Sequence, residues 1–195
     1  MGTGELNPAA CAAFLVAAFT VSGLCQAAWL CSAFSRRFSL PLDGGRTWRG
    51  HRLLGDNKTA RGFVVMVPAT ALSFAALAAL AGWTAGIAGL WPLTPAGYLV
   101  AGFWAGLGFM AGELPNSFVK RQLGIDAGAS PPGLVASAVS LLADRLDSVI
   151  GMLIVLSLVV PVPWLIWLYV LVAGPVLHGA FSLLVFRLGG KERAA

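Results

Sequence analysis

Long stretches without a charged side chain dominate this sequence. Thirty uncharged residues separate Glu5 from Arg36, 51 separate Arg61 from Glu113, and 39 separate Asp147 from Arg187. A helix needs about 20 apolar residues to cross the hydrocarbon core of a bilayer, so each run is long enough for one or two crossings. Charged residues make up 11% of the chain, whereas soluble domains carry roughly 25%. We therefore predict an all-α integral membrane protein whose residues 1–195 form a single transmembrane domain.

Turn-forming residues divide the longer runs into separate helices. Pro161 and Pro163 split the last run. A helix that ended near residue 160 but began after Asp147 would be too short to cross, so it must begin earlier and carry charged residues within it. Glycines and prolines split the second run at Gly82, Gly86, Gly89, Pro92 and Pro95. The five predicted spans are 9–33, 63–82, 96–112, 134–160 and 164–186, with loops at 36–61 and 113–133.

The distribution of basic residues predicts the orientation in the membrane. All 13 Lys and Arg residues fall in the first loop, in the region 120–145, or in the tail that carries Arg187, Lys191 and Arg193. Because cytoplasmic segments are rich in Lys and Arg, we expect these three segments to be cytoplasmic and the N-terminus to be outside. The prediction is a multi-pass protein of the cell membrane whose positive charge serves phosphate binding at the cytoplasmic face, with no nucleic-acid partner and an undetermined oligomeric state.

The first loop combines glycines with cations. Glycines let backbone N–H groups converge on an anion, and Arg and Lys side chains supply positive charge, so the loop is predicted to hold the phosphates of a nucleotide. The alternative is a basic loop that contacts anionic lipid head groups. Two carboxylates within the cationic segment favour a structured site. The predicted nucleotide-binding residues are Asp43, Gly44, Gly45, Arg46, Arg49, Asp56, Lys58, Thr59 and Arg61.

Two carboxylates lie three residues apart in the predicted fourth span. On a helix, Asp144 and Asp147 project from the same side, whereas Arg145 points about 100° away. Carboxylates that face one place repel each other unless a cation lies between them. A magnesium ion bound by one or two carboxylates and by substrate phosphates meets this need. The alternative is a set of structural salt bridges to Arg145 or Lys120.

Polar residues also cluster where the third span is expected to leave the membrane. Glu113 is placed to act as a third ligand of the metal at the edge of the hydrocarbon region. Ser117, Lys120 and Arg121 follow at head-group depth and are predicted to bind a lipid phosphate. Ordinary anchoring of long basic side chains at the interface is the alternative for Lys120 and Arg121.

Four segments of the sequence form recognisable motifs: Leu42-Asp-Gly-Gly-Arg-Thr-Trp-Arg-Gly50, Leu53-Leu-Gly-Asp-Asn-Lys-Thr-Ala-Arg-Gly62, Ser117-Phe-Val-Lys-Arg-Gln-Leu-Gly-Ile125 and Asp144-Arg-Leu-Asp-Ser-Val-Ile-Gly151. They resemble the CDP-archaeol synthase family, which transfers a cytidylyl group from CTP to unsaturated archaetidic acid. Within them, Ser117-x-x-Lys-Arg and Asp144-Arg-x-Asp are also similar to parts of the phosphatidate cytidylyltransferase signature.

The resemblance implies a complete reaction. An oxygen of the lipid phosphate would attack the α-phosphorus of CTP, and pyrophosphate would leave. Mg²⁺ would be held by Asp144 and Asp147, with Glu113 as a possible further ligand, and Lys120 would join the two aspartates as a catalytic residue. The first loop would hold CTP as the co-substrate, and Ser117, Lys120 and Arg121 would hold the phosphate of an archaetidic or a phosphatidic acid.

Other functions fit parts of the pattern. A small transporter, or an accessory membrane subunit that binds anionic lipids, would place ionisable residues along a path through the bilayer, whereas here they gather on the predicted cytoplasmic side. A CDP-alcohol phosphotransferase would use a CDP-lipid rather than make one. Its Asp-x2-Asp-Gly-x2-Ala-Arg-x8-Gly-x3-Asp-x3-Asp pattern does not occur in this sequence.

Overall fold

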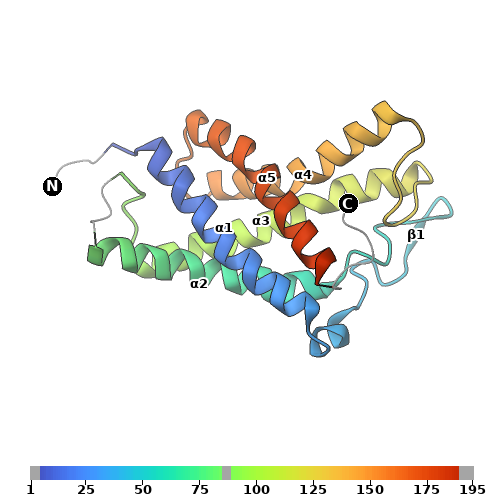
Figure 1. The fold of residues 1–195 in the computed structure, drawn as a ribbon, viewed down its shortest axis with the longest axis horizontal. Helices are drawn as coiled ribbons and strands as arrows, with labels where there is room; N and C mark the ends of the chain where they lie inside the picture. Colours follow the sequence, from blue (N-terminus) through green and yellow to red (C-terminus); the bar gives the residue numbers. More distant parts are fainter. Residues whose placement is uncertain (1–4, 85–88, 189–195) are drawn as a thin grey trace.

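The structure is a computed structural model that describes residues 5–84 and 89–188. It is all-α apart from one short hairpin, which agrees with the predicted fold class (Figure 1). The helices of the described residues are α1 (Pro8–Cys31), α2 (Ala60–Thr84), α3 (Pro95–Gln122), α4 (Leu134–Ser157) and α5 (Trp164–Arg187). Gly86 of the expected turn, and Lys191 and Arg193 of the expected basic tail, lie outside the described residues.

Three of the helices are long and apolar enough to cross a membrane by their length and composition. They are α1, α2 and α5. The other two helices, α3 and α4, carry part of the acidic and basic residues that the sequence singled out, including Glu113 and Lys120 on α3 and Asp144 and Asp147 on α4. The remaining charged residues of the predicted site lie in the segment before α2 or at the start of α2.

One end of the bundle is held together by hydrogen bonds between its turns. The backbone N–H of Asn7 donates to the carbonyl of Gly89 at 2.8 Å, and the indole Nε1 of Trp91 donates to the carbonyl of Pro161 at 2.7 Å. These bonds join the start of α1, the connection into α3 and the connection from α4 to α5. The loop that carries β1 lies at the opposite end of the molecule (Figure 1).

Helix α3 is longer than the sequence predicts. The prediction that a loop begins at residue 113 is wrong, because the helix continues past that residue. The helix continues to Gln122. Just beyond it, Gly124 has a φ of 73°, and its N–H donates to the carbonyl of Arg121. The N–H of Ile125 donates to the carbonyl of Lys120. This pattern is a Schellman cap. Because the polar side chains of the last turns pair with α4, the helix does not need to end where the apolar run ends.

The segment between α1 and α2 is folded. It contains the 3₁₀ helix η1 (Phe34–Phe38) and an antiparallel hairpin of β1 (Thr47–Trp48) and β2 (His51–Arg52). The two-residue turn of the hairpin has positive φ at both positions, 51° at Arg49 and 85° at Gly50. This is the geometry of a type I′ turn. At its base the loop closes through the N–H of Leu42, which donates to the carbonyl of Lys58 at 2.8 Å.

Candidate functional site

Glycines bring α3 and α4 into backbone contact. A methyl group added to Gly112 would overlap the main-chain oxygen of Asp147, and one added to Gly151 would come within 2.5 Å of Gly112 Cα. Gly108 faces the carbonyl of Gly151 in the same way, at 2.6 Å from an added methyl. We call this contact of Gly108, Gly112 and Gly151 the α3–α4 seam. Because main chain meets main chain there, the side chains beside the seam are held in fixed relative positions.

The two aspartates of α4 converge on one side chain of α3. The amide Nδ2 of Asn116 donates to Oδ1 of Asp144 at 2.6 Å and to Oδ2 of Asp147 at 2.9 Å. The hydroxyl of Ser148 donates to Oε1 of Glu113 at 2.9 Å and contacts Oδ1 of Asp147 at 3.3 Å. The spacing of three residues indicates a shared face, and the structure places both carboxylates on the same amide group.

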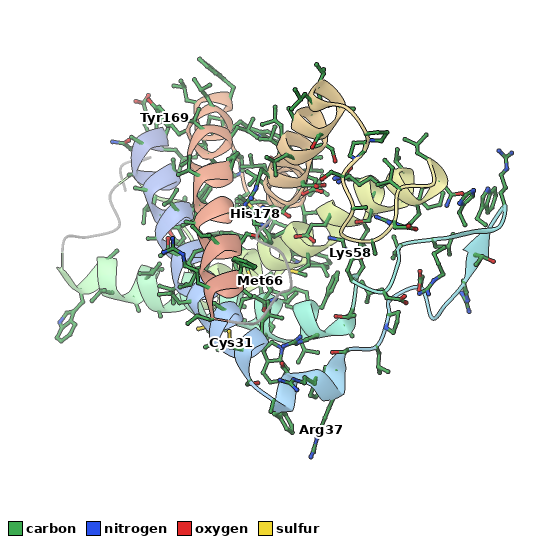
Figure 2. The ribbon with its side chains drawn as sticks, turned by 45° about the vertical axis from the view of Figure 1, so that its right-hand side comes forward. Cys31, Arg37, Lys58, Met66, Tyr169 and His178 are labelled. Carbon is green, nitrogen blue, oxygen red and sulfur yellow. The ribbon has the colours of Figure 1, made fainter. Side chains whose placement is uncertain are left out.

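Two lysines neutralise the acidic residues beside the seam. The ammonium of Lys120 is 2.6 Å from both carboxylate oxygens of Asp144. Lys58, from the loop before α2, forms an ion pair with Glu113 on α3. Figure 2 shows Lys58 at the inner edge of the loop, turned toward the interior of the molecule. This ion pair ties the end of the loop to the seam.

The described residues contain no group of three His, Cys, Asp or Glu side chains placed to hold a metal together. The predicted set of Asp144, Asp147 and Glu113 is therefore not assembled as one three-carboxylate site. Glu113 is engaged by Lys58 and Ser148, whereas the two aspartates point at one amide nitrogen. Two converging carboxylates offer the hard oxygen ligands that Mg²⁺ prefers, and Mg²⁺ commonly takes one or two such ligands from a protein.

The glycine-rich part of the loop already surrounds an anion, and that anion is Asp43. Its carboxylate accepts hydrogen bonds from the amides of Gly45, Leu54 and Gly55 at 3.0 to 3.1 Å, and from Arg52 Nη2 at 2.7 Å. The hydrogen bond from Arg52, together with the backbone amides, lowers the pKa of the Asp43 carboxyl well below its usual range. The converging amides predicted for a phosphate thus hold a side chain of the protein itself.

The loop residues predicted to bind nucleotide divide into three groups. One group lines a cavity of about 760 Å³ together with the residues beside the α3–α4 seam. Asp43, Gly44 and Arg46 line a separate recess beside Phe118, and Gly45 and Arg49 line neither space. The predicted site residues that do line the larger cavity are Asp56, Lys58, Thr59, Arg61, Glu113, Ser117, Lys120, Arg121, Asp144 and Asp147.

Two of the cavity-lining arginines are bonded to main-chain oxygens. The guanidinium of Arg61 donates to the carbonyl of Leu30 at the end of α1 and to the hydroxyl of Ser35 at 2.8 Å. Arg121 is buried and donates to the carbonyl of Ile125 just beyond α3. The bonds of Arg61 join the start of α2 to the end of α1 and to η1, and the bond of Arg121 closes the turn after α3, so both arginines also have a structural role.

The cavity is polar at one end and apolar at the other. Beyond the ion pairs it continues between α1 and α5, where Val16 and Phe19 face Leu177 and Phe181. His178 also lines it and forms an edge contact with the ring of Phe109 at 5.9 Å between centroids. A cavity of this shape can accept a molecule that has a charged head and an apolar body.

Asn116 and Arg52 organise the two parts of the site. Sequence reasoning assigned no role to Asn116, and it counted Arg52 only among the cations of the phosphate-binding loop. A signal for Asn116 was present, since Glu113, Asn116 and Lys120 recur at the helical spacing that places them on one face. Arg52 had no comparable signal, because its pairing with Asp43 depends on the register of the hairpin.

Comparisons with known proteins give one consistent result. The family model for CarS-like CDP-archaeol synthases matches residues 28–194. The CDP-archaeol synthase of Methanospirillum hungatei is 35% identical over 78% of this chain and 88% of its own length. That of Halorubrum lacusprofundi is 36% identical over 78% of this chain and 82% of its own. A solved structure, described as an intramembrane enzyme for archaeal membrane lipid biosynthesis, is similar with a TM-score of 0.52 and 27% identity, over 82% of this chain and 90% of that one.

Proposed function

The chain belongs to the CDP-archaeol synthase family, a family of CTP-dependent cytidylyltransferases of the membrane, and from this premise we propose that it activates a lipid phosphate. In the proposed reaction the cytidylyl group of CTP passes to a lipid of the archaetidic acid type. The products are a CDP-lipid for phospholipid biosynthesis and pyrophosphate. Phosphatidic acid is a second candidate substrate, because apolar walls distinguish weakly between isoprenoid and acyl chains.

The observation that carries this proposal is the two-ended cavity. Its polar end collects Lys58, Lys120 and the two aspartates of α4, and its apolar end lies between α1 and α5. A lipid phosphate needs both surroundings at once, whereas CTP needs the polar end alone. The meeting of a soluble and a membrane substrate in one cavity is what the transfer requires.

The proposed placement in the membrane has five crossings, with the N-terminus outside and the C-terminus in the cytoplasm. In support, α1, α2 and α5 are apolar enough to cross, and the packing of α3 against α4 through glycines suits helices that cross together. The loop with its arginines lies at the end of the molecule opposite the start of α1 (Figure 1). This arrangement opens the polar end of the cavity to the cytoplasm, where CTP is available.

We assign the nucleotide phosphates to Lys58 and Thr59, at the end of the loop that reaches the cavity. Lys58 is already paired with one anion, Glu113, and 20% of its side chain is exposed, so its ammonium can be shared with a phosphate oxygen. Lys120 forms an ion pair with Asp144, and Ser117 lies beside it on the same helix face. Lys120 is the proposed cation for the phosphates that react. Arg61 and Arg121 hold the walls of the cavity in place.

Mg²⁺ is the proposed cofactor, and Asp144 and Asp147 would hold it. When bound, the ion supplies positive charge to the phosphate oxygens. The protein contributes the fixed seam and the amide of Asn116, which keep the two carboxylates turned toward one point. Glu113 is connected to the same group through the hydroxyl of Ser148.

The proposed chemical step needs no general base. A phosphate monoester is already anionic near neutral pH, so its oxygen can attack the α-phosphorus of CTP directly. A new phosphorus–oxygen bond forms as the bond between the α-phosphorus and the bridging oxygen breaks, and pyrophosphate leaves. The residues of the chain position the two phosphates and neutralise their charge, which is the main protein contribution in phosphoryl-type transfers.

The test is transfer by the purified protein in detergent or vesicles. With CTP, Mg²⁺ and archaetidic acid we expect equal amounts of CDP-lipid and pyrophosphate, and a parallel reaction with phosphatidic acid measures the preference for the lipid chains. Asp147→Asn should reduce kcat/KM by about 100-fold or more, because a carboxylate that organises the phosphate charge is lost. The matched control is Asp126→Asn, since Asp126 lies exposed in the α3–α4 connection.

Two results would contradict the proposal. Wild-type protein that binds CTP but forms no CDP-lipid with either lipid phosphate is not the proposed enzyme. Equal activity of Asp147→Asn and Asp126→Asn would remove the aspartate pair from the mechanism, provided that both variants elute as folded protein.

A further inference from the structure

Arg145 is a cation of the cavity wall without a partner in the part of the chain that the structure describes. It lies on α4 between Asp144 and Asp147, and it lines the large cavity. Its Nη1 atom is buried and has no hydrogen-bond partner there. Buried guanidinium groups are normally paired, because an uncompensated charge within a membrane protein carries a free-energy penalty. Arg145 as a whole is half-buried, so its Nη1 is a buried donor that an anion from outside these residues would satisfy.

The other cations of the cavity differ from Arg145 in this respect. Lys58 is paired with Glu113 and Lys120 with Asp144. Arg61 and Arg121 donate to main-chain carbonyls. Each of these four side chains has at least one acceptor within the protein, although the Nε atom of Arg121 is also buried without one. An entering anion would therefore have to compete with an existing bond of each side chain, whereas Arg145 Nη1 can donate to an anion without giving up a bond.

The surroundings of Arg145 indicate which part of the cavity it serves. A methyl group added to Gly179 on α5 would lie 3.2 Å from Arg145 Nη1, so the guanidinium rests against the main chain of α5 where that helix has no side chain. The neighbouring Leu177 and Phe181 belong to the apolar end of the cavity. Figure 2 shows His178, the residue before Gly179, in the interior of the molecule. Arg145 thus stands on the side of α4 that faces the proposed lipid chains.

We propose that Arg145 binds the phosphate group of the acceptor lipid from the α5 side of the cavity. This inference rests on the proposed function and adds a substrate-binding residue to it, in place of the structural salt bridge that the sequence left open. A guanidinium presents parallel N–H donors that match two oxygens of a phosphate monoester. Arg145 would thus add a second cation for this phosphate beside Lys120, which lines the same cavity.

The test compares the two substrates in Arg145→Gln. We expect KM for the lipid phosphate to rise by about 10- to 100-fold, which is the loss of one or two charge-assisted hydrogen bonds. KM for CTP should change by less than about twofold. Because no described residue pairs with Arg145 Nη1, the melting temperature of the substrate-free protein should stay the same or rise, as often happens when a functional charge is removed.

Three further variants sharpen the test. Arg145→Lys keeps the charge but loses the paired donors, so its KM for the lipid phosphate should lie between those of wild type and Arg145→Gln. Gly179→Ala should raise this KM by a smaller factor, because the new methyl displaces the flexible end of Arg145. Arg37→Gln is the matched control, since Arg37 is exposed on η1 at the outer edge of the molecule (Figure 2).

A binding measurement separates this inference from the proposed function. In the absence of CTP, archaetidic acid should raise the melting temperature of wild type more than that of Arg145→Gln, and the neutral dialkylglycerol should not distinguish them. If wild type makes no CDP-lipid, the proposed function itself is wrong. If wild type is active but Arg145→Gln has a lowered melting temperature, a changed KM for CTP, or equal stabilisation by archaetidic acid, the role of Arg145 is wrong.

Discussion

The α3–α4 seam and the loop before α2 are both rich in charge, yet they hold their charges in different ways. Beside the seam, main-chain contact fixes two helices and leaves Asp144 and Asp147 at the wall of a cavity, with Lys120 paired to Asp144. In the loop, the amides and Arg52 turn inward onto Asp43, whereas Arg46 and Arg49 are exposed.

The difference shows that the same residue types can build a site or build a scaffold. A carboxylate that accepts bonds on all sides, as Asp43 does, has no capacity left for a ligand. A carboxylate held by one amide and one lysine, as Asp144 is, can exchange these partners for a metal or a substrate. Lys58 connects the two regions, because it belongs to the loop and pairs with Glu113 beside the seam.

Among the variants that compare the two regions, Lys58→Met should cause the largest loss of activity. We expect kcat/KM for CTP to fall by about 100-fold or more, because Glu113 loses its partner and the nucleotide phosphates lose a cation. Arg46→Met is the comparison variant, with an expected loss below about threefold, since Arg46 lines the separate recess. Steady-state kinetics with varied CTP measure both. Similar losses in the two variants would mean that the hairpin also serves the active site.

A smaller but still clear effect is expected from Gly112→Ala. The added methyl meets the main-chain oxygen of Asp147, so the helices must separate and the aspartates of α4 lose their contacts with Asn116 and Lys120 on α3. Activity should fall by about 10- to 100-fold, and stability by about 1–3 kcal/mol. Gly82→Ala is the control, because an added methyl on that α2 glycine meets nothing within 4 Å. Thermal melts and CDP-lipid formation should both distinguish the variants, and equal behaviour would show that the seam is not under tight constraint.

Asp43→Ala should loosen the loop more than it affects catalysis. It leaves three amides and Arg52 without their acceptor, so the N–H groups of Leu54 and Gly55 should exchange with solvent about 10- to 100-fold faster. Asp56→Ala should change these rates little, because Asp56 pairs with the same arginine but is 77% exposed. Hydrogen exchange followed by mass spectrometry gives both rates, and faster exchange in both variants alike would contradict the central role of Asp43.

The same carboxylate predicts how the loop responds to pH. Since folding lowers the pKa of Asp43, its contribution to stability is fully present above the unfolded pKa of about 4. That contribution is lost progressively as the pH falls below this value toward the folded pKa. We therefore expect amide exchange in the loop, corrected for its intrinsic pH dependence, to be protected equally at pH 5 and 7. Protection that falls already between pH 7 and 5 would require another titrating group.

The smallest expected effect is that of Arg49→Gly at the tip of the hairpin. Arg49 has a positive φ, which costs a residue with a Cβ about 1–2 kcal/mol. The greater freedom of glycine in the unfolded chain offsets part of this gain. The substitution should slow exchange of the hairpin amides by up to about fivefold and change KM for CTP by less than about threefold. A large rise in KM for CTP would show that Arg49 contacts the nucleotide and that the hairpin is part of the active site.

Much of the fold follows from the sequence. Uncharged runs of sufficient length indicate helices, and the shortness of the stretch after Asp147 requires α4 to begin earlier, where the structure has Leu134. The end of α3 could not be read in this way. Its last turns carry Glu113 and Lys120, which look like the start of a loop until their partners on another helix and in the distant loop are known.

The candidate site was partly predictable for the same reason. The i, i+3 spacing of Asp144 and Asp147 is local, so the sequence alone gives their common face. The partner of Asp43 is not local in this sense, because Arg52 lies nine positions further along the chain and reaches Asp43 only in a particular hairpin register. Contacts of this kind depend on the tertiary fold, and composition alone cannot distinguish an amide cluster that binds a phosphate from one filled by the protein itself.

The enclosed carboxylate of Asp43 has a calorimetric consequence. A loop that condenses around a nucleotide buries surface as it orders, and this produces a large negative heat-capacity change on binding. A loop already closed around its own anion has little left to order. Titration of CTP into the protein at several temperatures should therefore give a small heat-capacity change, of the size expected for a ligand that enters a preformed pocket.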